Sequence, residues 1–254
     1  MGTALNLWYT RPEDISAQTI AEDSERILSE EELLRSKTFR FERHRREYLA
    51  TRLLVRNALS YYHPLPPHAW KFQTNPYEKP ATDPDCGLRF NLSNCTELVV
   101  CLIAKDVELG VDIEPLDRAP DIVKLASDVF SPRELAQLED LSDPERPARA
   151  LSLWTLKESY IKARGLGLSL PLKHFSFVYD KSNKFHLEID RVLDDDDPAR
   201  WQFRLFNLVE HRVALAVESK IDPRLQIWEA QPPGNAPALR PDIATSQSET
   251  TLDM

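Results

Sequence analysis

The sequence has no long apolar run, few cysteines and no regular spacing of histidines. No stretch approaches the roughly 20 consecutive apolar residues that a membrane helix requires, so we expect no membrane partner. Residues 1–14 lack the cationic and apolar regions of a secretion signal, so a cytoplasmic location is expected. Asn6 stands where N-myristoylation would need Ser or Thr, so no acyl anchor is expected either.

The three cysteines, Cys86, Cys95 and Cys101, show no C-x-x-C spacing and have no accompanying histidine cluster. Neither a zinc site nor a disulfide framework is therefore expected. The net charge of −9 argues against a nucleic-acid partner. The charge is uneven, however, because eight Lys and Arg residues against two Glu lie between Arg35 and Arg56. From charge alone, this cluster is equally consistent with a binding surface and with a solvated helix face.

Helices are expected in two regions of the chain. Residues 29–62 contain no Gly or Pro and carry apolar residues at helical spacing, which predicts one or two helices with the arginines on a shared surface. Ser131 begins a further helix as an N-cap with Glu134 three residues later, and this helix should end near Leu141. Another helix is expected from about Pro147 to Arg164, stopping at Gly165.

Strands are expected in two successive sets, which makes the chain an α+β protein. The first set is spaced like antiparallel strands, and its middle member is apolar on both faces and should be central. These segments are 88–92, 97–104 and 109–114 in the first set, and 175–179, 184–189, 201–206 and 212–217 in the second. We expect domains over 1–111 and 112–230, followed by a disordered tail over 231–254 that is rich in Pro, Ser and Thr.

Two carboxylates alternate with apolar residues in the segment Gly110-Val111-Asp112-Ile113-Glu114. On a strand, Asp112 and Glu114 point to the same face about 6.5–7 Å apart, so both can converge on one cation. Magnesium prefers such carboxylate oxygens and is commonly shared with substrate phosphates. The same spacing is also routine on an exposed strand face.

A third carboxylate, Glu158, lies on the helix that contains Trp154-Thr155-Leu156-Lys157-Glu158-Ser159-Tyr160-Ile161-Lys162. At helical spacing, Trp154, Glu158 and Lys162 share one side. One interpretation is a surface Glu–Lys pair, worth a few tenths of a kcal/mol. The other is a partly buried carboxylate that needs a cation or metal partner.

These two segments, about forty residues apart, together resemble the paired signature of the surfactin-type phosphopantetheinyl transferases. Phe90-Asn91-Leu92-Ser93 resembles the family's F-N-x-S strand, Glu78-Lys79-Pro80 its G-K-P turn, and Gly165 to Leu168 with Pro171 the segment after its catalytic helix. The resemblance implies a monomeric enzyme that acts in secondary metabolism. Its single chain would fold as two similar halves. Each half would be a small antiparallel sheet packed with helices.

The resemblance also implies an activity and a site. The activity is transfer of phosphopantetheine from coenzyme A to a serine of an apo acyl or peptidyl carrier protein, with Mg²⁺, or alternatively Mn²⁺, as cofactor. Asp112, Glu114 and Glu158 would hold the metal, Glu158 would accept the serine proton, and Lys162 would contact the phosphate under attack. Coenzyme A would further be bound by Arg35, Arg46, Lys79, Ser93 and Asn94.

Two residues depart from the family pattern. Asn94 stands where members commonly have His, so the arginines would supply the charge for the 3′-phosphate. Glu78 replaces the glycine of the G-K-P turn, so the backbone there must avoid positive φ or accept strain.

Two other functions compete with this interpretation. A metal-dependent phosphodiesterase of the nuclease kind would place Lys beside Glu on the strand, but Pro115 follows Glu114. A catalytically silent module that binds coenzyme A or a carrier would not need all three carboxylates. The acidic run from Asp194 to Asp197 is expected to be a solvated loop and not a metal site.

Overall fold

The computed structural model describes residues 4–95, 97–193, 196–230 and 238–240. Within them, the first half of the chain has the order strand, three helices, four strands, and the second half repeats this order. The first half comprises β1 (Ala4–Thr10), α1 (Ala17–Ile27), α2 (Glu30–Ser36), α3 (Glu42–Tyr62), β2 (Lys71–Thr74), β3 (Pro80–Asp83), β4 (Leu88–Cys95) and β5 (Leu98–Lys105). The second comprises β6 (Leu109–Pro115), α4 (Ala119–Val129), α5 (Pro132–Glu139), α6 (Arg146–Arg164), β7 (Phe175–Tyr179), β8 (Phe185–Ile189), β9 (Trp201–Leu208) and β10 (His211–Glu218).

The strand order repeats as well. The main sheet of the first half contains β1-β5-β4, and that of the second contains β6-β10-β9, so equivalent strands occupy equivalent places. In each half the two short strands form a separate hairpin, β2-β3 or β7-β8. The expected α+β fold of two similar halves is therefore confirmed. The last strands, β11 (Arg224–Glu229) and β12 (Ala238–Arg240), extend the first sheet, with β11 parallel to β1.

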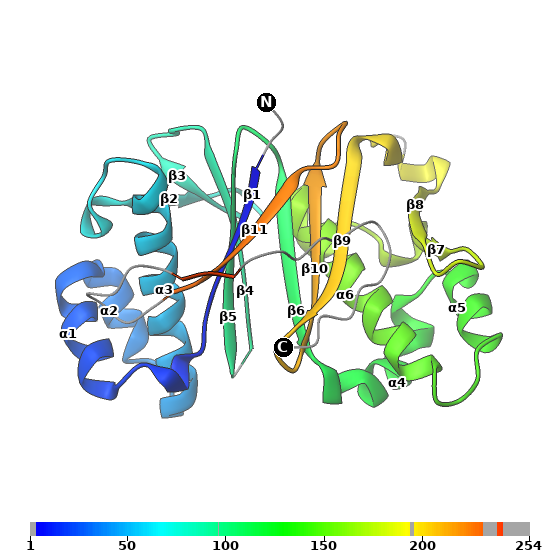
Figure 1. The fold of residues 1–254 in the computed structure, drawn as a ribbon, viewed down its shortest axis with the longest axis horizontal. Coiled ribbons are helices and arrows are strands. Elements are labelled where there is room, and N and C mark those ends of the chain that lie inside the picture. Colours follow the sequence, from blue (N-terminus) through cyan, green and yellow to red (C-terminus); the bar gives the residue numbers. More distant parts are fainter. Residues whose placement is uncertain (1–3, 96, 194–195, 231–237, 241–254) are drawn as a thin grey trace.

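The two sheets lie between two groups of helices (Figure 1). Alternate apolar residues of β1 and β5 pack against those of β6, β9 and β10, which forms a core between the sheets. The outer face of the first sheet packs on α3, and that of the second packs on α6. Because β5 has both faces covered, its continuous apolar sequence is explained, and its predicted central position is confirmed.

Two expectations about the strands and helices are wrong. β6 does not pair with β5 but joins the second sheet beside β10, because the chain crosses between sheets at residues 106–108. Arg56 does not lie on a basic surface, since it is buried and donates to Glu32 and to the Pro67 and Trp70 carbonyls. A buried guanidinium needs these partners to offset its desolvation.

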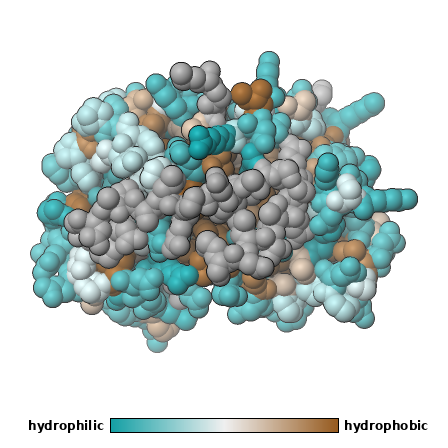
Figure 2. Space-filling view, in the orientation of Figure 1, coloured by the Kyte–Doolittle hydropathy of each residue, from teal (hydrophilic) through white to brown (hydrophobic). Residues whose placement is uncertain are grey.

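The domain boundary at residue 111 stays a prediction, although by element order the second half begins with β6 at Leu109. The expected disordered tail lies outside the described residues except for Ala238–Arg240, which pair with β11. Among the described helices, none is long and apolar enough to cross a membrane. Hydrophilic residues cover most of the described surface that faces the viewer in Figure 2.

Candidate active site

Gly110 brings α6 against β6. A Cβ atom at this position would lie 2.1 Å from the Ser159 carbonyl oxygen and 2.4 Å from the Ala163 nitrogen. Both contacts are with backbone, so any larger residue would push the helix away from the strand. The glycine of the first motif thus places Glu158 and Lys162 of α6 beside the carboxylates of β6.

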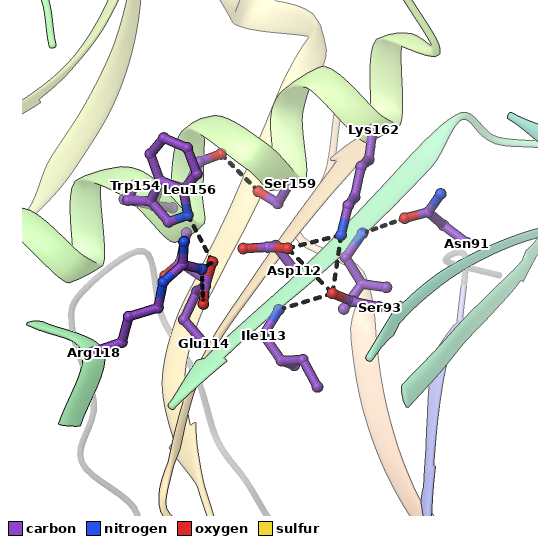
Figure 3. A network of polar contacts seen from close by, with 12 residues as sticks. Asn91, Ser93, Asp112, Ile113, Glu114, Arg118, Trp154, Leu156, Ser159 and Lys162 are labelled. Carbon is purple, nitrogen blue, oxygen red and sulfur yellow. Dashed lines mark hydrogen bonds and ion pairs between the residues drawn. The ribbon is translucent and has the colours of Figure 1, made fainter. Parts of the chain in front are cut away.

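Side chains of β4 join the edges of the two sheets. Asn91 Oδ1 accepts a hydrogen bond from the Val111 N–H at 2.9 Å, and Ser93 Oγ accepts one from the Ile113 N–H at 3.2 Å. The period of two along β4 points both side chains toward β6 (Figure 3). The F-N-L-S segment therefore connects the two halves where the predicted metal ligands lie.

Asp112 is buried, with 5% of its surface exposed. Its Oδ1 accepts hydrogen bonds from Lys162 Nζ at 2.7 Å and from Ser93 Oγ at 3.1 Å. Its Oδ2 is also buried and has no hydrogen-bond partner among the described residues. Burial raises the pKa of this carboxyl group, and the Lys162 charge opposes the shift. One carboxylate oxygen is thus left to accept a cation or a proton.

Glu114 lies two residues further along β6 and is also buried. Trp154 Nε1 donates to its Oε1 at 2.7 Å, and one guanidinium nitrogen of Arg118 contacts both carboxylate oxygens (Figure 3). Arg118 was not among the residues predicted from the sequence. A basic residue four positions after Glu114, beyond the end of the strand, was the only signal available.

Glu158 makes no side-chain hydrogen bond or ion pair with the described part of the chain, and it does not form the surface pair with Lys162 that one interpretation expected. Lys162 instead points to Asp112 and Ser93. Burial, followed by the negative charge of Asp112, raises the pKa of Glu158 to about 7. The partly buried carboxylate is therefore the interpretation that the geometry favours.

The three carboxylates interact electrostatically, but they do not converge on a common point where a metal ion could bind. Over the described ranges, no group of three His, Cys, Asp or Glu side chains is arranged to hold a metal ion. The donor set nevertheless fits Mg²⁺, because it offers carboxylate oxygens only, one of them buried without a partner. The charges of Asp112 and Glu114 both raise the Glu158 pKa, and a divalent cation would relieve this repulsion.

A pocket of about 500 Å³ lies between α3 and the end of β4. Arg35 and Arg52 line it, and their guanidinium groups lie over the Tyr48 ring at 5.9 and 5.3 Å from its centroid. Neither arginine is ion-paired with a carboxylate of the described residues. Asn94 also lines the pocket, and its amide donates to Glu47. The arrangement suits a phosphate group, since two guanidinium groups face a common space.

Arg46 and Lys79, both predicted to bind coenzyme A, lie elsewhere. Arg46 donates to the Pro12 carbonyl at 2.9 Å and to that of Ile15, so it fastens the segment after β1 to α3. Lys79 Nζ donates to Glu108 and to the Ala163 carbonyl, both at 2.6 Å, near the end of α6. Their side chains are thus already engaged by the protein.

At Glu78 the backbone was expected either to avoid positive φ or to accept strain, and it accepts strain. Glu78 has φ of +66°, a conformation that glycine adopts freely and glutamate rarely does.

Lys157, next to Glu158 in the helical motif, has a structural role. Its ammonium group is fully buried and pairs with Glu134 at 2.8 Å. It also donates to the Leu172 and Phe175 carbonyls, while Glu134 accepts from the Phe177 N–H. These bonds fix the rotation of α6 relative to α5 and β7, so that Glu158 and Lys162 face β6.

Of the acidic run from Asp194 to Asp197, Asp194 and Asp195 lie outside the described residues, and Asp196 is not solvated as the sequence interpretation expected. The carboxylate of Asp196 is almost fully buried, with 1% exposed. It accepts hydrogen bonds from Arg164 at 2.8 Å, from Trp201 Nε1 at 2.7 Å and from the Tyr160 hydroxyl. This residue anchors the segment to the last turns of α6, and its partners come from distant parts of the sequence.

Comparisons with known proteins agree with the resemblance. A family described as the 4′-phosphopantetheinyl transferase superfamily (ACPS) matches residues 108–217. HetI of Nostoc sp., a 4′-phosphopantetheinyl transferase, is 34% identical over 58% of this chain and 64% of its own length. Sfp of Bacillus subtilis is 31% identical over 54% of this chain and 60% of its own length. The chain thus spans less than two thirds of these two relatives.

A longer match is to a phosphopantetheinyl transferase of Thraustochytrium sp., which is 30% identical over 75% of this chain and 70% of its own length. Among solved structures, a holo-(acyl-carrier-protein) synthase from Bacillus anthracis in complex with CoA (3′,5′-ADP) gives a TM-score of 0.37 at 19% identity. It covers 44% of this chain and 95% of that one. The synthase from Thermotoga maritima gives a TM-score of 0.37 at 22% identity, over 45% of this chain and 65% of that one.

Proposed function

Because this chain belongs to the 4′-phosphopantetheinyl transferase superfamily, we propose that it transfers the phosphopantetheine group of coenzyme A to a serine of an apo acyl or peptidyl carrier protein. The observation that carries the proposal is the cluster at the junction of β4, β6 and α6. There, a buried aspartate with an unpartnered oxygen lies beside Lys162 and beside a glutamate whose pKa is raised to about 7. Transfer of a charged phosphoryl group needs acidic groups that hold a metal ion or accept a proton, and basic groups that neutralise the phosphate charge.

The reaction joins the carrier serine oxygen to the phosphorus that bears the pantetheine arm. The bond from that phosphorus to the bridging pyrophosphate oxygen breaks, and adenosine 3′,5′-bisphosphate leaves with the bond electrons. Glu158 accepts the serine proton, directly or through water, because its carboxylate is held without another partner. Lys162, whose ammonium already lies beside Asp112, neutralises charge on the phosphate under attack.

Asp112, Glu114 and Glu158 would hold Mg²⁺, or Mn²⁺ in its place. When bound, the ion would neutralise the pyrophosphate and so stabilise the leaving group. The protein's contribution is to hold these oxygens beside Lys162, with Asp112 and Glu114 buried. Ser93 supports this site from β4, because its hydroxyl orients Asp112 by donating to Oδ1.

The nucleotide end of coenzyme A fits the pocket between α3 and β4. We assign its 3′-phosphate to Arg35 and Arg52, with Asn94 also lining the pocket, since neither guanidinium pairs with a carboxylate in the part of the chain that the structure describes. Arg46 is withdrawn from this role because its guanidinium is used by the Pro12 and Ile15 carbonyls. Lys79 stays a prediction for binding the nucleotide end of coenzyme A. A monomeric state and a cytoplasmic location also stay predictions.

Intact-mass spectrometry of a carrier protein tests the proposal. After incubation with coenzyme A, Mg²⁺ and this protein, an apo carrier should gain the mass of one phosphopantetheine group. A carrier with its acceptor serine replaced by alanine should gain nothing, and EDTA should prevent the change. A carrier of unchanged mass, with coenzyme A still bound tightly by the protein, would favour the silent binding module instead.

A further inference from the structure

The surroundings of Glu114 explain why the three carboxylates are not gathered around a common point. Arg118 contacts both oxygens of the Glu114 carboxylate, and Trp154 Nε1 donates to Oε1 at 2.7 Å. Both Glu114 oxygens therefore already accept from a donor, whereas Asp112 Oδ2 and the Glu158 carboxylate have no such donor among the described residues. A metal ion cannot use this carboxylate fully while both donors remain in place.

Arg118 is placed there by the local chain path. β6 ends at Pro115, and the short 3-10 helix η3 (Leu116–Arg118) turns the chain so that Arg118 returns to Glu114 four residues earlier. The guanidinium also lies over the Trp154 ring, 5.8 Å from its centroid. Three elements, β6, η3 and α6, thus supply the pair and the ring that supports it.

The two members of the pair differ in exposure. The Glu114 side chain is 9% exposed, whereas that of Arg118 is 41% exposed. Arg118 can therefore turn into solvent by side-chain rotation alone, while Glu114 stays fixed in the strand. Its departure would leave a buried carboxylate without its countercharge, which is unfavourable unless another cation replaces it.

We propose that Arg118 competes with a divalent metal ion for Glu114, and that it thereby keeps metal affinity low until coenzyme A is bound. The inference rests on the proposed function, which supplies the metal ion. A guanidinium and a divalent cation at the same carboxylate repel each other strongly at such short separation. The pyrophosphate offers Arg118 an alternative anionic partner, since guanidinium groups bind phosphate oxygens well. Metal and coenzyme A therefore bind with positive coupling.

Binding of Mn²⁺ to the metal-free protein tests this role without reference to catalysis. Free Mn²⁺ is followed by its electron paramagnetic resonance signal, first without and then with coenzyme A. Without coenzyme A, Arg118→Gln should bind Mn²⁺ about tenfold more tightly than the wild type, because the competing charge is gone. Coenzyme A should tighten Mn²⁺ binding in the wild type several-fold more than in Arg118→Gln.

Two control variants separate this effect from general electrostatics. Arg89→Gln removes the same charge from another i,i+4 pair, Arg89 with Asp85 at 2.7 Å, and should leave Mn²⁺ affinity within about twofold of the wild type. Asp112→Asn should weaken Mn²⁺ binding in the wild type and in Arg118→Gln. This result would show that the measured ion binds at the carboxylate site.

Equal or weaker Mn²⁺ binding by Arg118→Gln would overturn the competition, and weaker binding would mean that Arg118 organises Glu114 for the metal. Insensitivity of Mn²⁺ binding to Asp112→Asn would remove the metal site and the competition together. If the proposed function is wrong, the carrier mass stays unchanged when the wild-type protein is used. This result is distinct from the Mn²⁺ binding results above. An active enzyme with unaltered Mn²⁺ binding in Arg118→Gln would overturn this inference alone.

Discussion

Burial beside Asp112 raises the pKa of Glu158 to about 7, so this carboxyl group changes charge near neutral pH. In the unfolded chain a glutamate titrates near pH 4.3. The folded state therefore binds the proton more tightly, and the stability that this proton provides is lost as the pH rises through 7. At pH 8 without metal, the ionised Glu158 reduces the stability of the protein.

Glu158→Gln should therefore have two effects of opposite sign. Transfer to the carrier should be lost, because the proton acceptor and a metal ligand disappear together. In metal-free buffer at pH 8 the variant should be more stable than the wild type by about 1–3 kcal/mol, and this difference should shrink as the pH falls from 7 toward 5. Urea unfolding at pH 8 and at pH 5 measures the free energy of unfolding of both proteins.

Glu22→Gln provides a matched control, since Glu22 is an exposed glutamate on α1, and it should change neither quantity. Transfer by Glu158→Gln at a rate within tenfold of the wild type would contradict the assigned role. A stability difference that does not depend on pH would contradict the raised pKa.

Arg52 and Arg46 lie on the same helix but should behave differently. Arg52→Gln removes a guanidinium that faces the pocket, so it should raise the KM for coenzyme A about tenfold or more and change that for 3′-dephospho-coenzyme A little. Arg46→Gln removes the bonds to Pro12 and Ile15, so it should lower stability and affect both substrates alike. Steady-state kinetics with the two substrates make the comparison. An equal rise of both KM values in Arg52→Gln would place the 3′-phosphate elsewhere.

At the scale of elements, α6 carries two kinds of lysine. Lys157 points into the core and joins α6 to α5 and β7 through Glu134, with both side chains fully buried. Lys162 points to the carboxylates and is 28% exposed. The first determines how the helix lies, and we propose that the second acts on the bound phosphate.

Lys157→Met and Lys162→Met should separate these roles. Lys157→Met leaves Glu134 buried without its countercharge, which should cost about 3–5 kcal/mol of unfolding free energy. Lys162→Met should cost much less, yet it should lose most of the transfer activity. Urea denaturation and the carrier mass assay, applied to both variants, give the two readouts. Comparable stability losses in the two variants would show that Lys157 does not hold the helix in place.

Local sequence signals predicted some of these elements well. The apolar run of β5, the capping box at Ser131 and the stop at Gly165 each determine structure within a few residues, and the strand β7 was predicted with its observed ends. The strands β1 and β11 and the helices α1 and α4 were not predicted. β1 and β11 pair in parallel across more than two hundred residues of sequence, and no local pattern reports such a partner.

The same limit applies to single residues of the site. The placement of Asp112, Glu114, Glu158 and Lys162 could be predicted because a strand and a helix fix the side on which each lies, while their roles stay predictions. The contacts of Arg46, Lys79 and Asp196 could not be predicted, because their partners are carbonyls and side chains far away in the sequence. Charge alone does not distinguish a cation that binds substrate from one that already binds the protein.

At the scale of the whole molecule, the two similar halves have different tasks. The first half contributes the pocket with Arg35 and Arg52, and the second contributes the carboxylates on β6 and α6. Asn91 and Ser93 of β4 connect them by hydrogen bonds to the backbone of β6. We therefore propose that a single chain assembles the complete site where its halves meet.

A crystal structure of the protein with Mn²⁺ and coenzyme A, using the anomalous scattering of manganese, tests this claim most directly. The account predicts one Mn²⁺ bound by Asp112, Glu114 and Glu158 together with the pyrophosphate. It also predicts the 3′-phosphate at Arg35 and Arg52 of the same chain. Manganese bound away from these carboxylates, or a nucleotide bound between two copies of the chain, would contradict it.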